Sequence, residues 1–327
     1  MTEMKDGLTL GILTSGGDSP GMNSAIRAVV RTTLFHGSKI LGVTSGYEGL
    51  INGEYHSMGA RDVGGILQRG GTILQTRRSE RFFDKKFQRE AIRNMNLAGM
   101  DGLLVIGGEG SLNGAHALAE QGVKVIGIPA SIDNDIWGTD MAIGVDTAMN
   151  TIMDAVDKLR DTASSHTRAF LIETMGRGCG YLAVMAGIVC GAEIVLIPEV
   201  PTTVTEVASI LENAYLRGKT HAIVIVAEGA NIKTTELAEA IDAMDVGFKT
   251  RVTILGHIQR GGGPTAFDRM LSARLGSAAV QAMLAGESDV MVGLKGRSVE
   301  LIPLSQVIAH KRAANMEYYQ MARQLAH

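Results

Sequence analysis

The stretch that decides the fold is LTLGILTSGGDSPGMN, residues 8–23. Its first half is a continuous apolar run of strand length, which is typical of a strand buried on both faces of a parallel sheet. The run ends near the glycine pair Gly16–Gly17, and a helical pattern begins at Met22. A buried strand, a glycine turn and a helix in this order predict a βα unit, with its loop at the carboxyl end of the strand.

The same pattern recurs along the whole chain. Apolar runs that end in glycines or polar residues predict strands over Leu8–Leu13, Gly102–Ile106, Val123–Ile128, Ala169–Ile172, Ile194–Ile197, Ala222–Ala227 and Val252–Leu255. Helical patterns predict helices over Met22–His36, Ser111–Glu120, Thr147–Arg160, Tyr181–Cys190 and Thr265–Leu284. We therefore expect an α/β fold with parallel sheets, and the length of 327 residues allows two domains.

The composition is that of an ordinary globular protein apart from its glycine. Hydrophobic residues make up 45% of the chain, charged residues 20%, and the formal net charge is −3. This balance lacks the basic excess of a nucleic-acid-binding protein. Glycine occupies 41 of 327 positions, well above the ordinary share of about 7%, which indicates tight turns or places where the backbone approaches a ligand closely.

The sequence also indicates where the protein works. The beginning of the chain lacks the charged and apolar stretches of a signal peptide. The most apolar run, Tyr181–Pro198, contains Glu193, and it predicts a buried helix followed by a strand rather than a membrane span. The two cysteines, Cys179 and Cys190, match no metal spacing. We expect a cytoplasmic protein with no membrane or nucleic-acid partner.

Two glycine loops follow predicted strands. Gly16–Gly17 stand after the first, and Gly107-Gly108-Glu109-Gly110-Ser111 stand after the second. Glycines let backbone N–H groups approach a phosphate, and the helix that follows directs the positive end of its dipole there. Glu109 among such amides indicates a polyphosphate with its metal ion. A plain strand-to-helix turn explains either loop taken alone.

Carboxylates and cations stand after the later strands. Asp133 and Asp135, two residues apart in an extended loop, would point to opposite sides, so one can hold a metal while the other acts as a base; a cluster of Asx turns is the competing interpretation. Arg177, Arg260 and His257 suit a phosphorylated substrate, although a single arginine is more often part of a surface ion pair.

The motifs together resemble those of the bacterial ATP-dependent 6-phosphofructokinases, in the family's order and over essentially the whole chain. The segments that carry the resemblance are ILTSGGDSPGMNSAIRAVVR, GGEGS, SIDNDIWGTD, RDTASSHTR, MGRGCG and LGHIQRGGGPTAFDR. It implies two Rossmann-like three-layer lobes with mainly parallel sheets and the active site in the cleft between them. The larger, ATP-binding lobe would comprise residues 1–145 and 258–308, and the smaller, fructose 6-phosphate-binding lobe residues 146–257 and 309–327.

The resemblance also implies an activity and its residues. The γ-phosphate of ATP would pass to the 1-hydroxyl of fructose 6-phosphate, the committed step of glycolysis, with Mg²⁺ as cofactor. Asp133 would be the base, Asp135 and Glu109 would hold Mg²⁺, and the catalytic set would be Asp133, Arg177, Ser131 and Gly16. ATP would contact Gly16, Arg78, Gly107, Gly108, Gly110 and Ser111. The sugar phosphate would contact Ser131, Asp133, Arg168, Met175, Gly176, Arg177, Glu228, Arg251, His257 and Arg260.

Several positions bear on the phosphate donor and on the assembly. Pyrophosphate-using relatives have an aspartate where this chain has Gly110 and a lysine where it has Ala130, so ATP is favoured. Glu109 replaces the family's usual aspartate, and Phe83 replaces an arginine on the adenine side. Arg168 and Arg251 would reach into a neighbouring subunit's site, which implies a homotetramer.

A second site for ADP and phosphoenolpyruvate effectors is implied as well. Its matching residues are Arg27, Arg31, Arg160, Glu193, Arg217, Lys219 and His221. Basic positions of that site fall at Ala60 and Thr220, so we expect weakened or altered effector control. The alternatives to the ATP-dependent kinase are a pyrophosphate-dependent kinase and a non-catalytic sensor of sugar phosphate or nucleotide. A dehydrogenase is disfavoured because no G-x-G-x-x-G follows the first strand.

Overall fold

A computed structural model describes residues 7–326, and these form two compact units. Unit 1 comprises residues 7–131, 136–147 and 260–311, and unit 2 comprises residues 132–135, 148–259 and 312–326. The chain therefore passes between the units several times. The first of these passages, at residues 131–132, falls within the SIDND segment singled out in the sequence.

Unit 1 is built on a seven-stranded sheet in the order β11-β10-β5-β4-β1-β2-β3. The strands are β1 Thr9–Ser15, β2 Lys39–Val43, β3 Tyr55–Ser57, β4 Gly102–Gly107, β5 Val125–Pro129, β10 Val290–Lys295 and β11 Ser298–Pro303. The five central strands run parallel, and β3 and β11 pair antiparallel at the two edges. Every residue of β4 is buried, which confirms that the continuous apolar runs are strands covered on both faces.

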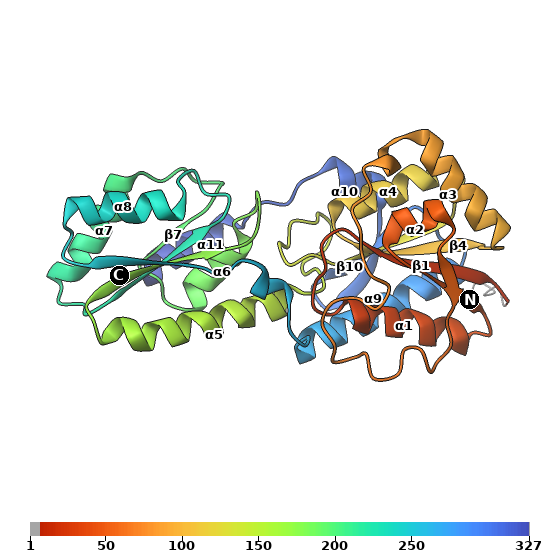
Figure 1. Ribbon diagram of the computed structural model, residues 1–327, viewed down its shortest axis with the longest axis horizontal. Helices are drawn as coiled ribbons and strands as arrows, with labels where there is room; N and C mark the ends of the chain where they lie inside the picture. The colour runs from red at the N-terminus through yellow and green to blue at the C-terminus, as the bar shows by residue number, and fades with distance from the viewer. Residues whose placement is uncertain (1–6, 327) are drawn as a thin grey trace. The chain divides into compact units, whose positions relative to one another are not determined.

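Helices cover both faces of this sheet. They are α1 Met22–Phe35, α2 Gly46–Asn52, α3 Lys85–Leu97, α4 Glu109–Ala119, α9 Ala266–Leu284 and α10 Leu304–Ala309. Figure 1 shows α1 and α9 together on one face and α2, α3, α4 and α10 on the other. The core between the layers contains fully buried side chains such as Leu10, Ile12 and Leu104, and burying a side chain of this size contributes about 1.5–3 kcal/mol.

Unit 2 has a smaller, four-stranded parallel sheet in the order β7-β8-β6-β9. Its strands are β6 Arg168–Thr174, β7 Ile194–Leu196, β8 Ala222–Ala227 and β9 Lys249–Ile254. Its helices are α6 Tyr181–Val189, α7 Val204–Leu216, α8 Thr234–Met244, α11 Met316–Leu325 and most of α5 Val145–Ser164. In Figure 1, α7 and α8 lie on one face of the sheet and α5 and α6 on the other. The expected α/β fold with parallel sheets is confirmed.

The helices of the structure are those of a globular α/β protein. Within residues 7–326, none is both long enough and apolar enough to cross a membrane. The apolar run Tyr181–Pro198 divides into α6 and β7, as the sequence predicts.

Candidate active site

The two glycine loops of unit 1 lie against each other. Their strands, β1 and β4, are hydrogen-bonded neighbours with Ser15 opposite Gly107. A Cβ atom at Gly107 would lie 2.5 Å from both the Ser15 carbonyl oxygen and the Ser111 Oγ, so only glycine fits there. Gly16 has φ +86°, a left-handed conformation that favours glycine. The two loops therefore present their backbone to the same edge of the sheet.

Each loop leads into a helix N-terminus. Helix α1 begins at Met22, and α4 begins at Glu109 directly after Gly108. The first N–H groups of a helix make no bonds within it, and together with the dipole they attract an anion such as a phosphate. Gly110 stands in the first turn of α4, and a Cβ placed on it would meet nothing within 4 Å. There is open space beside this helix end.

The guanidinium of Arg260 packs against the first glycine loop. Its Nη1 donates to the Asp18 carbonyl oxygen at 3.1 Å, and a Cβ at Gly17 would come within 2.5 Å of the same nitrogen. The guanidinium therefore stands beside the loop that we interpret as phosphate-binding. Arg78 is exposed, and nearby Phe83 is 84% exposed. Close by, Arg81 forms an ion pair with the Glu48 carboxylate.

Unit 2 contains Asp133, Asp135 and Arg177. The Asp133 side chain is 3% exposed, and its Oδ2 lies 3.6 Å from Nε of Arg177, whose side chain is 54% exposed. The expectation that the loop from Asp133 to Asp135 is extended is wrong, because Asn134 between them has φ +51° and turns the chain. Asp133 is nevertheless buried while Asp135 is half-buried, so the two carboxylates have different surroundings.

Arg177 is placed by its own backbone. The loop after β6 puts it at φ +50°, a left-handed conformation that costs a non-glycine residue about 1 kcal/mol or more. The backbone N–H groups of Gly176 and Arg177 both donate to Glu228 Oε1, at 3.2 and 2.7 Å. The Met175 N–H donates to Gln259 Oε1 at 3.2 Å. The structure thus brings Met175, Gly176, Arg177 and Glu228 together.

Arg168 and Arg251 lie elsewhere in unit 2. Arg168 is the first residue of β6, and Thr174, just before the Arg177 loop, is the last. Six steps along a strand span about 20 Å, so Arg168 lies at the opposite end of β6 from the Arg177 loop. Arg251, on the neighbouring edge strand β9, pairs in register with Phe170 and donates to the Thr250 carbonyl oxygen at 2.7 Å. His257 is exposed in the short helix Gly256–Arg260.

Two residues that hold the Arg177 loop were not assigned in the sequence. Gln259 is fully buried, and its side-chain nitrogen also donates to the Gly256 carbonyl oxygen at 3.0 Å. Glu199 accepts from the Gly180 N–H. Gln259 stands inside the quoted string LGHIQRGGG, so the motif contained that signal; Glu199 follows the ordinary strand Ile194–Leu196 and carries no motif.

Five of the expected effector residues belong to unit 2, whereas Arg27 and Arg31 are on α1 in unit 1. Lys219 Nζ pairs with Glu193 Oε2 at 2.6 Å. Burial, with a further contribution from the positive charge of Arg160, lowers the pKa of His221. The negative charge of Glu193 is therefore compensated by the ammonium group of Lys219.

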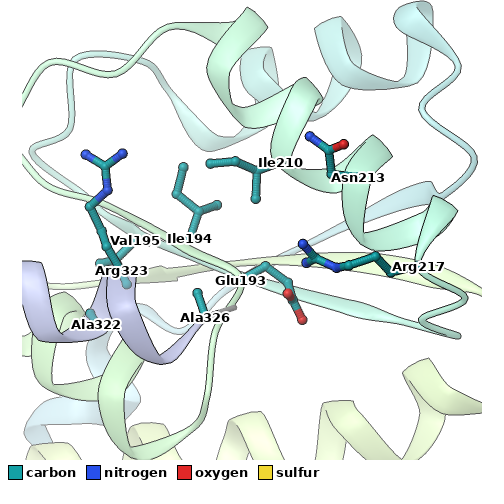
Figure 2. Close-up of a pocket in the computed structure, with 9 residues that line it drawn as sticks. All are labelled: Glu193, Ile194, Val195, Ile210, Asn213, Arg217, Ala322, Arg323 and Ala326. Atoms are coloured by element: carbon teal, nitrogen blue, oxygen red, sulfur yellow. The ribbon is translucent and has the colours of Figure 1, made fainter.

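Glu193 and Arg217 also line a cavity of about 190 Å³. Its other lining residues come from β7, α7, α11 and the residue that follows α11, and they are Ile194, Val195, Ile210, Asn213, Ala322, Arg323 and Ala326. Figure 2 shows the side chains of Glu193 and Arg217 extending toward each other on one side, with Arg323 on the opposite side and aliphatic side chains between. The cavity therefore has an arginine on each side, with the Glu193 carboxylate beside Arg217, and aliphatic side chains between them.

The described part of the chain contains no preformed cluster of metal-ligand side chains. Within residues 7–326, no group of three or more His, Cys, Asp or Glu side chains comes together in a way that could hold a metal ion. Glu109 belongs to unit 1 and Asp135 to unit 2.

The family model for phosphofructokinase matches residues 9–283. The chain belongs to the phosphofructokinase family. It is 49% identical over 318 residues to the ATP-dependent 6-phosphofructokinase of Thermotoga neapolitana, covering 97% of this chain and 99% of the relative. It is 46% identical over 318 residues to ATP-dependent 6-phosphofructokinase 1 of Thermus thermophilus, with the same coverage. The resemblance stated from the motifs is confirmed.

Solved structures agree on the fold. Pichia pastoris phosphofructokinase in the T-state matches with a TM-score of 0.89 and 36% identity over 94% of this chain, which spans 36% of that longer chain. A pyrophosphate-dependent phosphofructokinase from Marinobacter aquaeolei matches with a TM-score of 0.85 at 19% identity, covering 96% of this chain and 91% of the other. At that identity the second likeness speaks for the fold alone.

Proposed function

We propose that this chain is an ATP-dependent 6-phosphofructokinase, which transfers the γ-phosphate of ATP to the 1-hydroxyl of fructose 6-phosphate. The observation that carries the proposal is the buried Asp133 carboxylate beside the Arg177 guanidinium, in a chain with near-full-length ATP-dependent relatives. Such a pair combines a proton acceptor with a cation for a phosphoryl group.

In this proposal, unit 1 binds ATP and unit 2 binds the sugar phosphate. The glycine loops of unit 1, with Gly16, Gly107, Gly108, Gly110 and Ser111, would hold the triphosphate through backbone N–H groups and helix N-termini. Ser131 and Arg260 belong to this unit as well, and Arg78 would contact the nucleotide. Met175, Gly176, Glu228 and His257 of unit 2 would hold the sugar phosphate.

The transfer itself requires one proton acceptor and charge compensation. Asp133 takes the proton of the 1-hydroxyl as its oxygen bonds to the γ-phosphorus, and the bond from that phosphorus to the bridging oxygen of ADP breaks. The guanidinium of Arg177 stabilises negative charge on the transferring group. The products are fructose 1,6-bisphosphate and ADP, and the proton remains on Asp133 until it passes to solvent.

We propose Mg²⁺ as the metal. Glu109 and Asp135 offer carboxylate oxygens, which are the hard ligands that Mg²⁺ prefers, and one or two of them suffice when phosphates complete the coordination. The longer side chain of Glu109 is also an oxygen ligand and fits this role. When bound, the ion neutralises charge on the β- and γ-phosphates.

ATP is the donor that the residues favour over pyrophosphate. The open space beside Gly110 leaves room for a group that extends beyond the β-phosphate, and an aspartate there would fill that space with negative charge. Ala130 is 1% exposed, and its small side chain leaves no cation at that position.

We further propose a homotetramer with shared active sites and effector binding at Glu193, Arg217 and Lys219. The place of Arg168, at the opposite end of β6 from the Arg177 loop, supports a role in a neighbouring subunit's site, and Arg251 lies on the adjacent strand β9. Ala60 and Thr220 stand where the family's effector site has basic residues, so this chain has two fewer positive charges there. We therefore expect weakened inhibition by phosphoenolpyruvate.

The test is an assay of the purified protein with fructose 6-phosphate, Mg²⁺ and either ATP or pyrophosphate. Fructose 1,6-bisphosphate formed with ATP and not with pyrophosphate is the expected result. Formation with pyrophosphate alone would assign the chain to the other donor class. No product with either donor, together with binding of fructose 6-phosphate measured by calorimetry, would make the chain a sensor.

A further inference from the structure

The loop that carries Arg177 donates backbone hydrogen bonds to three side chains, each of which follows a different strand. Residues 175–180 follow β6 and cross the carboxyl edge of the unit 2 sheet. Gln259, after β9, accepts from the Met175 N–H, and Glu228, after β8, accepts from the next two N–H groups. Glu199, after β7, accepts from the Gly180 N–H. Each of the three remaining strands of the sheet, β7, β8 and β9, is thus followed by a residue that accepts a hydrogen bond from this loop.

Glu199 is the acceptor that the proposed reaction does not explain. The Gly180 N–H points at both carboxylate oxygens, at 2.9 Å from Oε1 and 3.1 Å from Oε2. A Cβ at Gly180 would lie 2.7 Å from Oε2 and 2.6 Å from the Ile197 Cβ, so a side chain there would displace the carboxylate. Gly180 is also the residue directly before α6, where a carboxylate is favoured by the helix dipole.

The same carboxylate binds a distant segment of the chain. Glu199 Oε1 accepts from the Ala314 N–H at 2.8 Å, more than a hundred residues further on. Two residues earlier, the Arg312 backbone nitrogen lies 3.4 Å from the Asp135 carbonyl oxygen. The Arg312 guanidinium lies 5.6 Å from the centre of the Tyr181 ring, at the start of α6. Residues 312–314 therefore contact the Asp133–Asp135 loop directly and are joined to the end of the Arg177 loop through Glu199.

We propose that Glu199 is a positioning residue for phosphoryl transfer, which clamps the Arg177 loop to residues 312–314 and so sets Arg177 against Asp133. The proposal rests on the proposed kinase function. Arg177 adopts a strained φ of +50°, and such a conformation persists only when its surroundings over-determine it. Glu199 supplies one of these constraints through the Gly180 N–H.

A purely structural role predicts a different pattern of defects. If Glu199 only stabilised α6, its loss would lower the melting temperature and leave the kcat of the folded protein unchanged. If it positions Arg177, its loss lowers kcat, because a misplacement of about 1 Å costs up to about 10²-fold in rate. The KM for ATP stays constant, because the loops assigned to ATP belong to unit 1.

The test compares Glu199→Ala and Glu199→Gln with Glu212→Ala, an exposed carboxylate on the nearby helix α7 that serves as the matched control. We expect Glu199→Ala to lose about 10–100-fold in kcat at unchanged KM for ATP. Glu199→Gln, which keeps a carbonyl acceptor, falls between it and the wild type. A kcat of Glu199→Ala equal to that of the control variant would overturn the proposal.

Amide hydrogen exchange provides a readout that does not depend on activity. In Glu199→Ala, the amides of Gly180 and Ala314 lose their acceptor, and we expect faster exchange at these two positions and at Arg177. Unchanged exchange at Arg177 would show that the clamp does not hold the loop. An inactive wild-type protein would refute the kinase function. The exchange data would still show whether Glu199 holds the Arg177 loop against residues 312–314.

Discussion

Replacing Gly229 with alanine is the sharpest perturbation of the Arg177 loop. Gly229 follows Glu228, whose carboxylate holds the N–H groups of Gly176 and Arg177. A Cβ at position 229 would lie 1.9 Å from the Arg177 carbonyl oxygen and 3.0 Å from its carbonyl carbon. Both contacted atoms belong to the backbone, so no side-chain rotation relieves the clash.

The size of the effect follows from these distances. Real Cβ contacts below 3.0 Å essentially never occur, so the new methyl group and the Arg177 carbonyl must move apart by about 1 Å, a displacement that costs up to about 10²-fold in rate at a catalytic group. The same overpacking costs about 1–3 kcal/mol of stability. We therefore expect Gly229→Ala to fold, to melt at a lower temperature and to lose about 10²-fold in kcat.

The assay is steady-state formation of fructose 1,6-bisphosphate below the melting temperature of the variant. Gly178→Ala is the matched control, because it adds the same methyl group in the same region, where a Cβ meets nothing within 4 Å. The control should keep a kcat close to that of the wild type. Equal kcat values for Gly229→Ala and Gly178→Ala would refute the claim that the backbone position of Arg177 limits catalysis.

Three further predictions concern stability, assembly and regulation. The hydrogen bond and charge of Arg81 hold the pKa of Glu48 below its usual value of 4.5, so the carboxylate stabilises the fold above that pH and loses this effect as the pH falls through its folded-state pKa. The melting temperature of Glu48→Gln should thus be lower than that of the wild type at pH 7, by an amount corresponding to at most about 1 kcal/mol, with the difference vanishing in acid; a difference that grows in acid would contradict this sign. Mixing inactive Arg168→Ala and Asp133→Asn proteins under subunit exchange should restore activity if active sites are shared, and no recovery in verified hybrids would exclude sharing. Thr220→Lys should strengthen inhibition in a phosphoenolpyruvate titration, and an unchanged titration curve would remove this position from effector control.

The sequence predicted most of the buried strands, because burial on both faces leaves a continuous apolar run. It did not predict β2 and β10, two of the five parallel strands of unit 1, although most of their residues are buried. β1, β4, β6 and β8 all lie where such runs were found. The edge strands β3 and β11 were not predicted, because most of their residues are exposed and their apolar side chains form no run. β3 and β11 could be recognised only from their pairing in the folded chain, whereas the edge strands β7 and β9 of unit 2 overlap with apolar runs and were predicted.

The candidate site was predictable only in part, for a related reason. Motifs pointed to Asp133 and Arg177, and the structure places these two side chains together. The turn at Asn134 agrees better with the competing Asx-turn interpretation than with the extended loop, and the sequence could not decide between them because asparagine tolerates a left-handed conformation without requiring it. Glu199 was missed as well, because its partners Gly180 and Ala314 lie far from it in the sequence and meet it only after folding.

The most direct test of the account is the kcat of Asp133→Asn with ATP and fructose 6-phosphate. Asparagine keeps the shape of this buried side chain and cannot take the proton of the attacking hydroxyl. The account predicts a loss of about 10²–10⁴-fold in kcat, with the melting temperature and the binding of fructose 6-phosphate retained. A kcat within a few-fold of the wild type would contradict the assignment of Asp133 as the base.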